Sequence, residues 1–136
     1  MYVDVLCMEM VRCPEQFDVI VTNNLFGDIV TDLGAQLQGG IGLAASGNLH
    51  PGQISLFEPV HGSAPTLVGK EIANPLAAIL SAGMMLSHLG HTALEQQILT
   101  AVQHCLHQGH VTAELGGSLS TRAVTDKVLE ALSSST

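Results

Sequence analysis

Two aspartates with helical spacing are the residues of this chain best suited to chemistry. Asp28 and Asp32 follow an apolar stretch, residues 17–21, and lie in a segment that predicts an amphipathic helix from Gly27 to Leu37. Side chains four positions apart share one face of a helix. Oxygen ligands of this kind suit Mg²⁺ or Mn²⁺ better than zinc. From spacing alone, the alternative stays open that both carboxylates simply favour the positive end of the helix dipole.

A second polar segment, residues 58–69, follows a short predicted strand at residues 54–57. It combines one acid, Glu58, one imidazole, His61, and the hydroxyls of Ser63 and Thr66 with turn-forming glycines and prolines. Loops at strand ends are frequent ligand sites in α/β proteins. Backbone N–H groups around Gly62–Ala64, together with the imidazole, could hold an anion or the polar part of a cofactor. A well-packed loop with an internally hydrogen-bonded histidine is an equal alternative.

The elements that position these segments follow from hydrophobic periodicity. Helices are expected at residues 3–12, 27–37, 76–89, 92–108 and 121–132, with strands at 18–22 and 54–57. A glycine-rich run, residues 39–48, lacks Gly-x-Gly-x-x-Gly, Gly-Lys-Ser/Thr and a helix after it, which argues against a phosphate loop. We interpret it as a tight bend and a small-residue strand that passes close to other backbone.

The amino-acid composition limits the classes of protein to which this chain can belong. The 136 residues are 46% hydrophobic and 12% charged, which indicates a globular domain. With 12 acidic residues, 4 basic residues and a net charge of −8, the chain lacks the cationic surface that nucleic acids require. It has no apolar run of membrane-spanning length, and its 3 cysteines form no Cys-x-x-Cys motif. We expect a cytoplasmic protein with reduced thiols and neither a nucleic-acid nor a membrane partner.

Four segments together resemble the signature of the β-decarboxylating dehydrogenases. They are Asn24–Asp32 (NLFGDIVTD), Glu58–Pro65 (EPVHGSAP), Gly69–Pro75 (GKEIANP) and Leu115–Thr121 (LGGSLST). This family includes 3-isopropylmalate, isocitrate, homoisocitrate and tartrate/malate dehydrogenases. The resemblance extends over essentially the whole chain but corresponds only to the C-terminal part of a family member. It implies a three-layer α/β fold of the isopropylmalate/isocitrate dehydrogenase type, which is not a Rossmann fold.

The resemblance also implies a division of roles along the chain. Residues 1–38 would belong to the dimerisation and metal-binding domain, and residues 39–136 would form the C-terminal part of the cofactor-binding domain. Asp28 and Asp32 match two metal carboxylates, and Asp4 matches a third, which in these homodimers reaches the metal of the neighbouring subunit. Mg²⁺ or Mn²⁺ held there acts as a Lewis acid in decarboxylation. The first two helices are therefore expected in a homodimer interface.

The segment from Glu58 to Asn74 matches the family's cofactor loop. The residues implied to bind NAD are Glu58, near the nicotinamide ribose, and, around the adenosine half, His61, Gly62, Ser63, Ala64, Pro65, Thr66 and Asn74. One departure concerns cofactor choice, because NAD-using members usually carry an aspartate at the position of Thr66. Threonine can hydrogen-bond to the ribose hydroxyls but cannot repel a 2′-phosphate. NAD is favoured, and NADP stays open.

The favoured activity is oxidative decarboxylation of 3-isopropylmalate, a step of leucine biosynthesis, with hydride transfer to NAD. Isocitrate and tartrate/malate are the alternative substrates. The family's catalytic tyrosine, general-base lysine and substrate-binding arginines match no segment here, so this polypeptide alone is predicted to be inactive. An alternative from another class is a truncated, non-catalytic subunit or interaction module that pairs through its first two helices.

Overall fold

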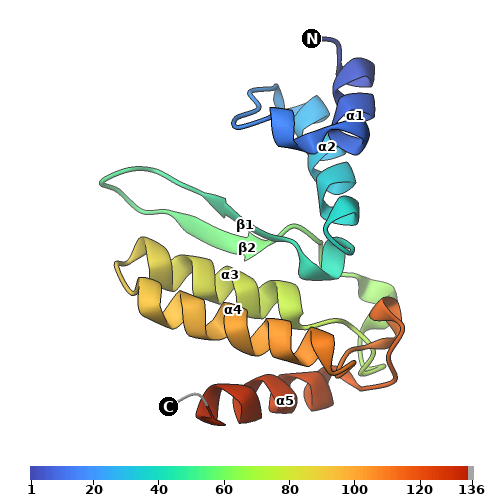
Figure 1. Ribbon diagram of the computed structural model, residues 1–136, viewed down its shortest axis with the longest axis vertical. Coiled ribbons are helices and arrows are strands. Elements are labelled where there is room, and N and C mark those ends of the chain that lie inside the picture. The colour runs from blue at the N-terminus through green and yellow to red at the C-terminus, as the bar shows by residue number, and fades with distance from the viewer. Residues whose placement is uncertain (135–136) are drawn as a thin grey trace.

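A computed structural model describes residues 1–134, in which the first two helices lie above a layered body (Figure 1). The elements are α1 (Val3–Arg12), α2 (Asn24–Leu37), β1 (Ala45–Asn48), β2 (Leu56–Pro59), α3 (Leu76–His88), α4 (Thr92–His107) and α5 (Thr121–Ser134). The β1–β2 hairpin covers α3, α3 packs on α4, and α4 packs on α5. All five predicted helices form. In the described part of the chain, no helix has the length and apolar character needed to cross a membrane.

The core lies between α3, α4 and α5. Its fully buried members include Leu76 at the start of α3 and Val124 on α5, each 0% exposed. Helices α3 and α4 are in direct contact at Gly83, where an added Cβ would lie at an ordinary van der Waals distance of 3.5 Å from Ile98. Burial of this cluster is the main stabilising contribution of the body. It supplies the rigid support for the loop that leads into α3.

The glycine-rich run forms a turn and a strand, as predicted. Strands β1 and β2 pair antiparallel, with Ala45 opposite Pro59 and Asn48 opposite Leu56. A Cβ at Gly47 would lie only 3.1 Å from the Phe57 ring, so a larger residue would push the ring away. The small-residue strand therefore passes close to its neighbour, and no phosphate loop forms.

The strand predicted at residues 18–22 is wrong. Val19 and Val21 are 82% and 92% exposed, and the segment makes no ladder hydrogen bond with any described residue. An extended apolar segment becomes a strand only when another strand pairs with it, and the sheet of the described residues contains only β1 and β2. The following helix begins at Asn24, three residues earlier than predicted, because the Asn23 side chain accepts a hydrogen bond from the backbone N–H of Phe26 at 3.1 Å.

Candidate functional site

Helix α2 positions the aspartate pair. Asp28 and Asp32 are both exposed and lie one turn apart on the same helix. The Asn24 side chain donates a hydrogen bond to Asp28 Oδ2 at 3.4 Å. Neither carboxylate forms an ion pair with another residue in the range 1–134. Most of their oxygen lone pairs thus remain available, so the donor set fits a hard divalent cation.

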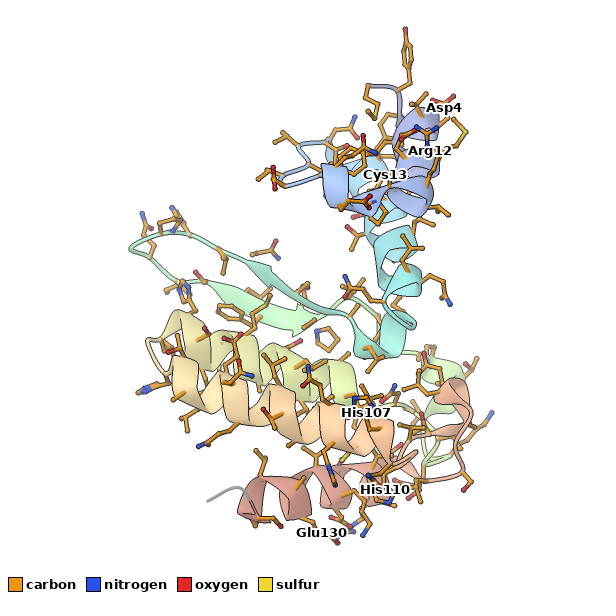
Figure 2. All side chains as sticks on the ribbon, viewed as in Figure 1. Asp4, Arg12, Cys13, His107, His110 and Glu130 are labelled. Atoms are coloured by element: carbon orange, nitrogen blue, oxygen red, sulfur yellow. The ribbon has the colours of Figure 1, made fainter. Side chains whose placement is uncertain are left out.

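Asp4 lies apart from this pair within one chain. It is exposed near the free end of α1, as Figure 2 shows. Helix α1 packs against α2 further along, where a Cβ at Gly34 would lie 3.5 Å from Met10 Cε. Across the described residues, no three histidine, cysteine, aspartate or glutamate side chains are grouped to hold a metal. Within one chain, Asp4 is therefore not grouped with Asp28 and Asp32 in the described residues.

A polar cluster fixes the end of α1 near this region (Figure 2). The Glu9 carboxylate accepts hydrogen bonds from Gln16 at 3.0 Å and Arg12 at 2.9 Å, and these two donors lower its pKa, Gln16 more than Arg12. The Cys13 thiol donates to Glu15 at 2.9 Å, which raises the pKa of the thiol. This cluster joins α1 to the turn at Pro14, and it lies on the surface rather than at the aspartate pair.

The segment predicted to be the cofactor loop, from Glu58 to Asn74, contains one histidine whose ring makes a defined contact. The Nδ1 atom of half-buried His61 lies 2.9 Å from the carbonyl oxygen of Gly62. A carbonyl only accepts, so Nδ1 donates in this contact and Nε2 is not used in it. The internal hydrogen bond expected of a packed loop is therefore present, and it leaves one ring nitrogen for a ligand. The other residues predicted to bind the cofactor along this stretch, Glu58, Gly62, Ser63, Ala64, Pro65 and Thr66, are exposed.

The loop backbone adopts two unusual conformations. Ala64 (φ 44°) and Glu71 (φ 56°) both occupy the left-handed region, which costs a residue with a side chain about 1–2 kcal/mol. The carbonyl of Ala64 accepts from the N–H of Leu67 at 2.9 Å, which closes the single turn Pro65–Leu67. Strain of this kind is typical of ligand-binding loops, where the surrounding structure holds it in place.

Asn74 ends the loop and is its buried member. Its Oδ1 accepts from the N–H of Leu76 at 3.1 Å, but the N-cap position of α3 is Pro75 and not Asn74 as predicted. Its Nδ2 has no hydrogen-bond partner in the described part of the chain. The adjoining backbone is anchored to α5, because Thr121 donates through Oγ1 to Ala73 O at 2.6 Å and through N–H to Glu71 O at 2.9 Å. The loop thus ends in a fixed amide with an unused donor.

Sequence reasoning missed one residue beside this amide. The Glu114 carboxylate accepts a hydrogen bond from the N–H of Gly42 at 3.3 Å, across 72 positions of the chain. The only sequence signal was its place directly before the Leu115–Gly117 turn. Nothing in local spacing could indicate that it contacts the glycine-rich run.

These features describe a helix-rich α/β unit with paired carboxylates on one helix and a strained polar loop between a strand and another helix. The chain belongs to the isocitrate/isopropylmalate dehydrogenase family, whose family model matches residues 1–131. The isocitrate/homoisocitrate dehydrogenase of Thermus thermophilus is 54% identical over 132 residues, covering 97% of this chain and 39% of that protein. The 3-isopropylmalate dehydrogenase of Archaeoglobus fulgidus is 47% identical, covering 96% of this chain and 40% of that protein.

The comparison with solved structures leads to the same family. The isocitrate dehydrogenase of Methylococcus capsulatus matches with a TM-score of 0.89 and 43% identity, covering 96% of this chain and 39% of that chain. The predicted family and fold class are confirmed, and the sheet in residues 1–134 is an antiparallel pair rather than a Rossmann-type parallel sheet. The chain spans about two-fifths of the length of the relatives it matches.

Proposed function

We propose that this chain is the metal- and cofactor-binding part of a β-decarboxylating dehydrogenase that oxidises a 2-hydroxy acid with NAD and releases CO₂. Residues 1–38 contribute to metal binding and dimerisation, and residues 39–136 contribute to cofactor binding, in a cytoplasmic enzyme. The observation that carries the proposal is the pair Asp28 and Asp32, one helical turn apart on an exposed face with no cationic partner in the described residues. Family membership supports the same assignment.

The metal ligands are Asp28 and Asp32 of one chain and Asp4 of a second chain in a homodimer. A bound Mg²⁺ or Mn²⁺ would supply Lewis-acid chemistry to the substrate. The chain's own part is to hold two carboxylates side by side and to orient one of them, since Asn24 donates to Asp28. The exposure of Asp4 on α1 is consistent with a ligand that acts across a dimer.

The cofactor site is the loop from Glu58 to Asn74. Support comes from the ring nitrogen of His61 that its contact with Gly62 leaves over, and from Asn74, whose side chain is held at the end of the loop by the N–H of Leu76. NAD is the proposed cofactor. NADP is a second candidate, because Thr66 brings no negative charge to oppose a 2′-phosphate.

The proposed substrate is 3-isopropylmalate. Isocitrate and homoisocitrate form a second candidate, favoured by the 54% identity to the relative that carries those names. All are 2-hydroxy acids with a carboxylate positioned to leave as CO₂, so the proposed metal site serves each of them in the same way.

A Mn²⁺ titration by calorimetry tests the metal site without requiring turnover. Asp28→Asn and Asp32→Asn each remove one charged ligand, and each should weaken Mn²⁺ binding by about tenfold or more. Asp126→Asn is the matched control, because it removes an exposed carboxylate from α5 and should leave the affinity within about twofold. Equal affinities for the wild type and both site variants would refute the proposed metal site.

A further inference from the structure

Glycine at position 42 leaves room for two polar groups from distant parts of the chain. Gly42 is buried in the single turn Ile41–Leu43, and its N–H donates to Glu114 Oε1. A Cβ added there would collide with Glu114 Oε2 and would lie 2.8 Å from Asn74 Nδ2. The carboxylate and the amide therefore both lie against the Cα of the same glycine. Any side chain at this position would displace one of them.

The Asn74 amide has a defined orientation in this contact. The Asn74 amide is oriented by its Oδ1, which accepts from Leu76, so its NH₂ group must point the other way, toward Gly42. That NH₂ group is buried without a hydrogen-bond partner in residues 1–134, and the Glu114 carboxylate is an acceptor on the same side. A negative charge beside an unpaired donor stabilises this orientation of the amide and opposes its flip.

Three segments of the chain meet at this contact: the Gly42 turn, the loop that carries Glu114 and the segment leading into α3. Figure 1 shows the loop that carries Glu114 beside the segment leading into α3. Hydrogen bonds from Thr121 to Glu71 and Ala73 join the same two regions. The end of the cofactor loop is thus held both at its backbone and at the side chain of Asn74.

We propose that Glu114 is a positioning residue of the cofactor site, which sets the Asn74 amide through its contact with the Gly42 turn. This inference rests on the proposed function, in which Asn74 binds the adenosine half of the cofactor. Glu114 itself touches no ligand in this scheme. Its carboxylate fixes the orientation of the Asn74 amide. Its hydrogen bond to Gly42 fixes the distance between the Ile41–Leu43 turn and the cofactor loop.

The test is a double-mutant cycle on NAD binding, measured by calorimetry with the whole 136-residue chain. Glu114→Gln keeps the size but places an NH₂ group against that of Asn74, and it should weaken NAD binding about tenfold. Asn74→Ala should weaken binding to a similar extent or more. If Glu114 acts through Asn74, the double variant will bind no worse than Asn74→Ala alone.

Controls separate positioning from a general structural role. Glu130→Gln removes an exposed carboxylate on α5 and should leave NAD binding within about twofold. Glu114→Asp keeps the charge on a shorter side chain and should restore part of the affinity lost in Glu114→Gln. Each variant should bind Mn²⁺ as the wild type does, since the aspartate pair lies on α2. Loss of Mn²⁺ binding in Glu114→Gln would show a structural role and overturn the inference.

Failure of the proposed cofactor site and failure of the proposed role of Glu114 give different results. A wild-type chain that binds Mn²⁺ but not NAD refutes the proposed cofactor site, and the inference with it. A wild-type chain that binds NAD, combined with an unchanged affinity in Glu114→Gln, refutes only the role of Glu114. Additive losses in the double variant refute it as well, because they show that Glu114 acts independently of Asn74.

Discussion

Replacing Leu76 by alanine tests whether the cluster between α3, α4 and α5 is the stabilising core of the chain. Leu76 is 0% exposed, and two of its core neighbours, Ala101 and Cys105, are too small to fill the space it would leave. Removing three methyl or methylene groups costs about 2.4 kcal/mol in transfer free energy, at about 0.8 kcal/mol for each group. A residual cavity adds about 1 kcal/mol. The free energy of unfolding should therefore fall by about 3.5 kcal/mol.

Urea unfolding followed by far-UV circular dichroism measures this loss. Leu129→Ala is the matched control, because it makes the same chemical change on α5 at a side chain that is 56% exposed, and it should cost less than about 1 kcal/mol. The hydrogen bond from Leu76 to Asn74 uses the backbone N–H, so NAD binding should persist in the variant under conditions where it is folded. Equal losses for the two leucines would refute the assignment of the core.

Three further predictions follow from the site and the core. Asp4→Asn should weaken Mn²⁺ binding at concentrations where light scattering shows a dimer and leave it unchanged where the chain is monomeric. Thr66→Asp should weaken NADP binding about tenfold relative to NAD, through repulsion of the 2′-phosphate, as measured by calorimetry. Burial, and secondarily Glu130, raises the pKa of the Cys105 thiol, so it should resist Ellman's reagent at pH 8 until the chain unfolds. Because the folded state holds this proton more tightly, stability should fall as pH rises above 9.0, and Cys105→Ala should reduce that fall.

The helices were predictable because their signals are local. Apolar spacing, the proline directly before α3 and the glycines after α3 and α4 specify helix positions from neighbouring residues alone. The strand at residues 18–22 was not predictable in the same way. Its composition favours an extended segment, but pairing depends on a partner that no local pattern supplies, and the described residues supply none.

The same distinction applies to the candidate site. The spacing of Asp28 and Asp32 guarantees that they share a helix face once α2 forms, so the sequence predicted their arrangement. The contact between Gly42 and Glu114 joins residues 72 positions apart, and the sequence only showed that both lie in glycine-rich segments. Side-chain contacts of this separation depend on the packing of the whole body.

The glycine-rich turn links the two halves of the proposed site. Gly39 and Gly40, with φ near 115°, end α2, and the N–H of Gly40 donates to Ala35 O at 3.0 Å. Two residues later, Gly42 donates to Glu114 beside Asn74. The turn that ends the helix bearing the aspartate pair is therefore the turn that the Glu114 carboxylate holds against the cofactor loop. Because a methyl group at this position would displace the Glu114 carboxylate and crowd the Asn74 amide as well, Gly42→Ala should weaken NAD binding more than Glu114→Gln does.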